Sequence, residues 1–265
     1  MNNKSEQFTS TSVTIVRSDG TMSENKQVNI VREHFMNLFI NGQLIARFDC
    51  TPSNLKELIV GRLITEKLIN SKDDIGVINI SDDASIAEVV LNSNCAYSYK
   101  NEVKADLTSL ASNKVFVSRE VKRDCSENDQ IQLGENDNIC LNKDWIFKLA
   151  QAFSEETKLH KSTNGTHSCI LSVKGQIVFL VEDIGRHNAI DKAIGYALLN
   201  NYDMKNCMIF TSGRVSADMI SKAVNCGLTV LVSKSVPTSL AVKMAMENKI
   251  KLVCKAWPDS YEVYD

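Results

Sequence analysis

From residue 145 to the C-terminus, short apolar runs alternate with longer segments whose apolar residues recur at helical spacing. The short runs have the length and β-branched content of buried strands, and they cover 168–173, 177–181, 207–210, 228–232 and 251–254. The helical pattern covers 145–153, the residues that follow Asn188, 217–226 and a segment ending at Asn248. Strand alternating with helix predicts a parallel sheet with crossover connections. The first two strands, with Gly175 between them, are expected to form an antiparallel pair.

The N-terminal half follows a different pattern. Residues 36–46 read as a β-hairpin, because Asn41-Gly42 is a dipeptide that a type I′ turn favours. Pro52 suits the first turn of a helix, and Asn54 with Glu57 resembles a capping box. The helix that follows has one apolar stripe and is expected to pack in the core. Strands are expected at 13–16, 77–80, 87–91 and 115–117. We therefore predict an α/β protein with a small α+β domain at 1–115 and a larger α/β domain at 116–265.

Three polar turns stand out because each follows a predicted strand and precedes a predicted helix: 182–188, 211–216 and 233–239. Ligands of open α/β sheets bind at the carboxyl ends of strands, where the N-termini of the next helices favour anions. The turns carry the cations and hydroxyls that a phosphorylated ligand needs: Arg186, His187, Thr211, Ser212, Arg214, Ser216, Lys234, Thr238 and Ser239. Asn188 is a candidate N-cap. The alternative is that the hydroxyls only cap helices, the charges form a solvated turn and His187 is a structural histidine.

Composition narrows the classes of function. The chain has 265 residues, a hydrophobic fraction of 43% and a net charge of -2, which argues for a globular protein and gives no reason to expect nucleic acid or an anionic membrane as partner. The longest apolar runs are too short to span a bilayer, and the polar N-terminus does not resemble a signal peptide. We expect a cytoplasmic protein. G-x-G-x-x-G, Walker A and zinc-deaminase motifs are all missing, which argues against those classes and against a zinc site.

The eight cysteines are scattered, and none forms a C-x-x-C pair. Several lie in apolar runs, as free buried thiols do in a reducing compartment. Cys125 differs, because it lies in the long polar segment 118–142 beside Lys122 and Arg123. Nearby cations could lower its pKa and make it a reactive thiolate, although an exposed, unreactive thiol is the alternative. Cys140 ranks second because its apolar neighbours would raise its pKa.

Several of these segments together resemble the FdhD family of formate dehydrogenase accessory sulfurtransferases. The most specific is 182–192, which reads EDIGRHNAIDK. Segments 164–167, 211–216 and 237–242 resemble the family's other turns, and 51–61 resembles its N-terminal half. The resemblance extends over nearly the whole chain.

The resemblance implies a protein that receives sulfur as a persulfide from a cysteine desulfurase. Such a protein passes the sulfur to the bis(molybdopterin guanine dinucleotide) cofactor that formate dehydrogenase requires. It also implies a homodimer and a three-layer C-terminal domain that resembles cytidine deaminase without the zinc. Cys125 would carry the sulfur. The expected cofactor-binding residues are His167, Glu182, Asp183, Arg186, His187, Asn188, Thr211, Ser212, Arg214, Ser216, Lys234, Thr238 and Trp257.

Two departures from the family pattern matter. The family loop usually has two cysteines as C-G-x-C-G, whereas 118–142 has Cys125 followed by Ser126. One thiolate is still sufficient to carry a persulfide. The C-terminal segment also lacks the family's arginine, and Trp257 could stack on a pterin or guanine there or simply pack in the core.

The lone cysteine motivates an alternative function, a chaperone that binds the molybdenum cofactor without transferring sulfur. A deaminase relative acting on free nucleotide is disfavoured, because nothing in the sequence supplies an activated water.

Overall fold

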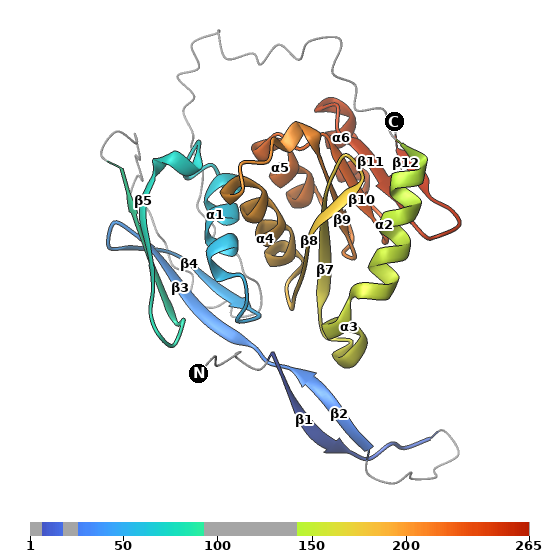
Figure 1. Ribbon diagram of the computed structural model, residues 1–265, viewed down its shortest axis with the longest axis horizontal. Coiled ribbons are helices and arrows are strands. Elements are labelled where there is room, and N and C mark those ends of the chain that lie inside the picture. The colour runs from blue at the N-terminus through green and yellow to red at the C-terminus, as the bar shows by residue number, and fades with distance from the viewer. Residues whose placement is uncertain (1–6, 18–25, 93–141, 265) are drawn as a thin grey trace.

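Layers of sheet and helix follow one another across the molecule (Figure 1). The structure is a computed structural model that describes residues 7–17, 26–92 and 142–264. From right to left in Figure 1, helix α2 covers one face of a six-stranded sheet, and α4, α5 and α6 cover the other face. Helix α1 lies against α4 and α5, and a four-stranded sheet lies beyond α1. The chain is therefore a mixed α/β protein, as predicted, and the more specific likeness to cytidine deaminases stays a prediction.

The larger sheet has the strand order β12-β11-β10-β9-β7-β8. Its strands are β7 (His167–Val173), β8 (Gln176–Asp183), β9 (Cys207–Thr211), β10 (Val230–Ser233), β11 (Lys251–Cys254) and β12 (Glu262–Tyr264). Strands β9, β10 and β11 are parallel, which confirms the alternation read from the sequence. Strands β7 and β8 form the predicted antiparallel pair, but β7 lies between β8 and β9 and runs against both. The sheet is consequently mixed rather than wholly parallel.

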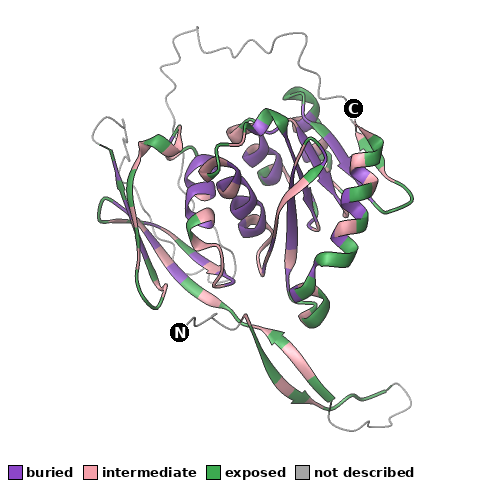
Figure 2. Cartoon of the chain, in the orientation of Figure 1, coloured by how far each residue is buried: buried purple, intermediate pink, exposed green. Residues whose placement is uncertain are grey.

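Figure 2 shows buried residues along the strands of this sheet and along the helices that cover it, and their apolar side chains form a core on each face. Helices α4 (Arg186–Leu199), α5 (Ala217–Cys226) and α6 (Ser239–Glu247) form one core with it. Helix α2 (Lys143–Glu156) forms a second core on the opposite face, and the short α3 (Lys158–Thr163) follows it. Gly227 ends α5 with a φ of 77°, as expected for a C-cap glycine.

The N-terminal half contains a four-stranded sheet of order β4-β3-β6-β5, covered on one face by α1 (Leu55–Thr65). Its strands are β3 (His34–Ile40), β4 (Gln43–Cys50), β5 (Ile75–Ile80) and β6 (Ile86–Leu91), and the 3₁₀ turn η1 (Lys72–Asp74) precedes β5. The predicted hairpin is present, and both Asn41 (φ 48°) and Gly42 (φ 81°) have the positive φ of a type I′ turn. Strands β1 (Phe8–Val13) and β2 (Lys26–Val31) form a separate ribbon that projects from the body in Figure 1.

Helices α1 and α4 cross at two glycines. A Cβ on Gly61 would lie 1.8 Å from the carbonyl oxygen of Asp191, and a Cβ on Gly195 would lie 1.9 Å from that of Glu57. Only glycine permits the two backbones to approach so closely, because it has no side chain. Helices α1 and α4 thus form a closely packed contact between the N-terminal sheet and the larger sheet.

Some sequence predictions were wrong in detail. Asn188 does not cap α4: the cap is Gly185, and Asn188 lies inside the helix. Asn54 does cap α1, but its backbone is left-handed and its side chain makes no capping hydrogen bond, so the capping box is absent. The first strand, predicted at 13–16, instead covers Phe8–Val13 and ends where it was expected to begin. The 3₁₀ turn η2 (Met204–Asn206) precedes β9 and was not anticipated. The predicted strand 115–117 and the domain boundary at 115/116 lie outside the described residues, as does segment 118–142 except for its last residue.

Candidate functional site

The three polar turns predicted from the sequence leave the same edge of the larger sheet. Strand β8 ends at Asp183, β9 at Thr211 and β10 at Ser233, and each is followed by the N-terminus of α4, α5 or α6. Because β7 runs the opposite way, its first residue, His167, lies at this edge too, opposite Asp183. The structure therefore brings His167 between the first and second turns, which strand alternation alone could not predict.

Main-chain hydrogen bonds join the turns to one another. The N–H of Ser212 donates to the carbonyl oxygen of Ser168 at 3.0 Å, and that of Lys234 donates to Thr211 at 2.9 Å. Val215 donates to Val236 at 3.1 Å, while Thr238 donates back to Val215 at 2.9 Å. The second and third turns are thereby fixed to each other and to the start of β7, so their side chains form one surface.

Three buried polar atoms at this edge have no hydrogen-bond partner within the described part of the chain: Arg186 Nε, His187 Nε2 and Ser216 Oγ. Arg186 is the first residue of α4, and its side chain packs on Gly213 in the second turn, where a Cβ would come within 2.9 Å of the Arg186 Cβ. Ser216 is the N-cap of α5 but makes no capping hydrogen bond. Buried polar groups are normally paired, so this group of free donors and acceptors indicates a ligand site.

Burial favours the neutral form of both histidines of the site. The pKa of His187 is lowered to about 4, chiefly by burial and additionally by Arg186, Lys222 and Arg62, against the opposing effect of Asp191. Burial also lowers the pKa of His167, helped by Arg186 and His160 and opposed by Asp183. The Nδ1 atom of His167 lies 3.2 Å from Ser212 Oγ, which also accepts a hydrogen bond from the N–H of Ser168 at 3.0 Å. Neutral imidazoles beside Arg186 can serve as hydrogen-bonding groups for an anion without adding charge.

Asp183 is fully buried and surrounded by partners from the protein itself. Its Oδ2 lies 2.5 Å from Lys192 Nζ and accepts hydrogen bonds from the N–H and Oγ1 of Thr51, both at 3.1 Å. Its Oδ1 accepts from the N–H of Gly185 and from Asn188 Nδ2. With both oxygens occupied, the contacts favour a structural role, in which Asp183 ties Thr51 of the N-terminal half to the turn before α4.

Glu182 points to the other face of β8, as alternation along a strand requires. Its carboxylate accepts hydrogen bonds from the N–H groups of Leu159 and His160 at 2.8 and 2.7 Å, at the start of α3. A carboxylate at a helix N-terminus is a stabilising arrangement. Glu182 therefore anchors α3, and this contact is separate from the three unpartnered atoms of the edge.

The remaining predicted residues divide into framework and surface. Thr211 is buried and its Oγ1 accepts from the N–H of Gly213 at 3.2 Å, while Thr238 caps α6 through the N–H of Ala241. Arg214 is exposed. Trp257 is 43% exposed rather than packed in the core, and Lys234 Nζ lies 4.6 Å from the centre of its ring. A cation on one face of an exposed indole leaves the other face available for stacking.

Sequence reasoning missed a set of charged residues behind this edge. Arg62, Asp191, Lys192 and Lys222 are largely buried, and all four make ion pairs. Asp191 and Lys192 fall between the apolar pairs 189–190 and 193–194 of α4, and their partners lie on other elements, so their burial could not be predicted from spacing.

The cysteines of the described residues are unsuited to nucleophilic chemistry. Burial raises the pKa of Cys50, Cys169, Cys226 and Cys254 to about 12 and that of Cys207 to about 11. Thiolates are the reactive form, so these five are structural. The predicted sulfur carrier Cys125, and Cys140, lie outside the described residues. No group of histidine, cysteine and acidic side chains suited to a metal ion occurs among residues 7–17, 26–92 and 142–264. Within these ranges no helix is long and apolar enough to cross a membrane.

Comparison with known proteins gives consistent matches. The model of the FdhD/NarQ family matches residues 31–265. The sulfur carrier protein FdhD of Listeria monocytogenes is 31% identical over 92% of this chain and 92% of its own length. That of Bacillus licheniformis is 30% identical over 96% and 94%, and protein FdhD of Methanocaldococcus jannaschii is 30% identical over 88% and 86%. The fold matches the crystal structure of a proposed formate dehydrogenase accessory protein from Desulfotalea psychrophila, with a TM-score of 0.74 and 20% identity over 98% of this chain and 97% of that one.

Proposed function

Because this chain belongs to the FdhD/NarQ family, we propose that it is a sulfur carrier for the molybdenum cofactor. It takes sulfur from a cysteine desulfurase and passes it to the bis(molybdopterin guanine dinucleotide) cofactor of a formate dehydrogenase. It acts in the cytoplasm as a homodimer. The name of its relatives supports the sulfur-carrying role, and the chemistry of the site supports the choice of client cofactor.

The observation that carries the proposal is the group of unpartnered buried atoms, Arg186 Nε, His187 Nε2 and Ser216 Oγ. A nucleotide diphosphate group offers oxygens that accept from a guanidinium, from a hydroxyl and from an imidazole N–H. The N-termini of α4 and α5 add free N–H groups, since neither helix has a side-chain cap. The residues present thus fit the phosphates of a guanine dinucleotide.

Further residues extend the proposed site beyond the phosphates. His167 and Ser212 contact each other at the start of β7 and in the second turn, and Arg186 lies close enough to His167 to lower its pKa. Trp257, held by Lys234 on one face, offers a platform for the guanine or the pterin. Arg214 is exposed and can contribute charge at the mouth of the site. Glu182, Asp183 and Asn188 hold the frame of the site rather than contact the ligand.

Sulfur transfer needs one accessible thiolate. In the first step the Cys125 thiolate attacks the terminal sulfur of the desulfurase persulfide, forming a persulfide on Cys125 and releasing the desulfurase cysteine as thiolate. The five cysteines whose environment is described are held as thiols by burial, which leaves Cys95, Cys125 and Cys140 as candidates for the carrier. Cys125 with its neighbours Lys122 and Arg123 is our assignment for the carrier.

The test is complementation of a host that lacks its own protein of this family. The wild-type chain is expected to restore formate dehydrogenase activity, and Cys125→Ser is expected to restore none. Cys140→Ser is the matched control and is expected to behave as wild type. Full activity of Cys125→Ser would support the alternative, a chaperone that binds the cofactor and transfers no sulfur.

A further inference from the structure

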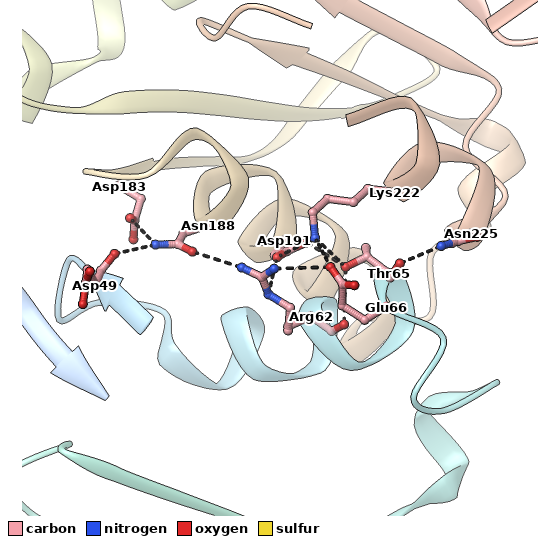
Figure 3. Close-up of polar contacts among 9 residues, drawn as sticks. All are labelled: Asp49, Arg62, Thr65, Glu66, Asp183, Asn188, Asp191, Lys222 and Asn225. Atoms are coloured by element: carbon pink, nitrogen blue, oxygen red, sulfur yellow. Dashed lines mark hydrogen bonds and ion pairs between the residues drawn. The ribbon is translucent and has the colours of Figure 1, made fainter. Parts of the chain in front are cut away.

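Three charged side chains from three helices meet behind the candidate site (Figure 3). Asp191 of α4 is fully buried between Arg62 of α1 and Lys222 of α5. Lys222 Nζ lies 2.9 and 3.1 Å from the two carboxylate oxygens, and Arg62 Nε lies 3.0 Å from Oδ2. The Arg62 contact is an ion pair rather than an aligned hydrogen bond. Thr65 and Glu66, at the end of α1, complete the cluster by contacting Lys222.

Arg62 also reaches the turn that carries the site. Its Nη2 donates to Asn188 Oδ1 at 3.4 Å, and Asn188 Nδ2 donates to the carbonyl oxygen of Asp49 at 2.7 Å and to Asp183 Oδ1 at 3.0 Å. Figure 3 shows this chain of contacts running from Asp183 through Asn188 to Arg62. One guanidinium thus contacts α4 at two positions, one turn apart. Arg186 and His187, which supply two of the three unpartnered atoms, are the first residues of that same helix.

The cost of this cluster argues for a role beyond stability. Removing charges from water is expensive, and well-packed apolar residues often serve at least as well in such positions. The orientation of the Arg62 side chain is further constrained, because its guanidinium lies 5.3 Å from the ring centre of Phe48. A guanidinium with fixed contacts to Phe48, Asn188 and Asp191 has one orientation. It therefore fixes the position of α4 relative to α1.

We propose that Arg62 is a positioning residue for the anion site: from the N-terminal half of the chain it fixes the first turn of α4, and with it Arg186 and His187. The inference rests on the proposed function, because it concerns the affinity of that same site. Arg62 does not contact the ligand. Its effect is exerted through Asn188 and Asp191, which makes the N-terminal half part of the binding apparatus.

The test uses the full chain and guanosine diphosphate as the probe, with binding followed by calorimetry. Arg62→Met removes both the charge and the guanidinium, whereas Arg62→Lys keeps the charge and removes only the guanidinium with its several N–H donors. Both are expected to weaken binding by about threefold to thirtyfold, the range for residues that act on a site without touching the ligand. Arg47→Met is the matched control, because Arg47 lies exposed on β4 and donates its hydrogen bond to Asn37. The affinity of this variant for guanosine diphosphate should remain within about twofold of wild type.

Two further measurements separate positioning from a loss of stability. The charged groups facing His187 are Arg186 and Asp191 of α4, Lys222 of α5 and Arg62 of α1. Arg62→Met should raise the pKa of His187, followed by NMR, because a neighbouring cation is lost, whereas Arg62→Lys should leave it near the wild-type value. In an Arg186→Gln background, Arg62→Met should weaken binding less than in wild type, because part of its effect passes through Arg186.

The outcomes are distinct. If the wild-type chain binds guanosine diphosphate and both folded Arg62 variants bind it equally well, the positioning role is wrong and the proposed function stands. If Arg62→Met does not fold, the affinity of Arg62→Lys for guanosine diphosphate decides, and wild-type affinity in that variant refutes the positioning role. If the wild-type chain does not bind the probe, the proposed function fails and this inference fails with it.

Discussion

Neighbouring residues of the segment 182–188 have different tasks, and the division follows from which way each side chain points. Glu182 and Asp183 alternate across β8, so the first anchors α3 and the second binds Lys192 and Thr51. The sequence predicted this segment as the centre of the site, because charged residues lie between a predicted strand and a predicted helix. It could not separate ligand contacts from framework, since Thr51 lies over 100 residues away in the chain.

Arg186 is the residue with most to contribute to affinity, because its Nε is buried without a partner while Arg214 is exposed. Arg186→Gln should weaken binding of guanosine diphosphate by about tenfold to a hundredfold, the size of a hydrogen bond to a charged group. Arg214→Gln makes the same change in the second polar turn. It should weaken binding by about threefold or less, because exposed charges are screened. Calorimetry on the two variants tests this order, and an equal loss in both would refute the assignment.

His187 makes the stability of the protein depend on pH. Burial lowers its pKa from the ordinary value of 6.5 to about 4. The unfolded chain therefore binds a proton in this window while the folded chain does not, so the free energy of unfolding falls as the pH falls from 6.5 to 4. Urea unfolding at several pH values should show this decrease, and His187→Asn should reduce its slope.

The same group also reports ligand binding. An anion placed beside His187 favours the imidazolium, so bound guanosine diphosphate should raise the pKa of His187 in an NMR titration. His34, on β3 of the N-terminal sheet, provides an internal reference. A shift of His34 with no change in His187 would place the anion elsewhere.

At the scale of elements, apolar periodicity predicted most of the described helices and strands of the C-terminal half, together with the hairpin at Asn41-Gly42. It did not predict the order of strands, and so it missed that β7 inserts between β8 and β9 and brings His167 to the site. Nor did it predict that α1 packs against α4. The pattern along one element carries no information about which other element it contacts, so it did not identify the two glycines of that crossing.

The crossing of α1 and α4 gives a prediction at this scale. Gly61→Ala and Gly195→Ala each place a Cβ within 2 Å of a carbonyl oxygen, so the helices must separate. We expect a loss of about 2 kcal/mol or more in the free energy of unfolding for each, as for overpacked cores. Gly227→Ala is the control, because its Cβ meets nothing within 4 Å and only the positive φ of 77° is unfavourable, at about 1 kcal/mol. Equal losses in all three would contradict the close crossing.

At the scale of the whole molecule, the two halves cooperate in building one site. Thr51 and Arg62 come from the N-terminal half, and they hold Asp183, Asn188 and Asp191 of the other half. The sequence predicted two domains and a site within the second. The structure adds buried contacts from the N-terminal half to the turn before α4 and to α4 itself.

In the proposed function, Cys125 carries the sulfur. The direct test is the intact mass of the protein after incubation with a cysteine desulfurase and free cysteine, followed by peptide mapping, with Cys125→Ser and Cys140→Ser treated in parallel. We predict a gain of one sulfur atom, mapped to Cys125, that is absent from Cys125→Ser and retained in Cys140→Ser. A wild-type chain that binds guanosine diphosphate yet gains no sulfur would contradict the claim and leave a cofactor-binding chaperone.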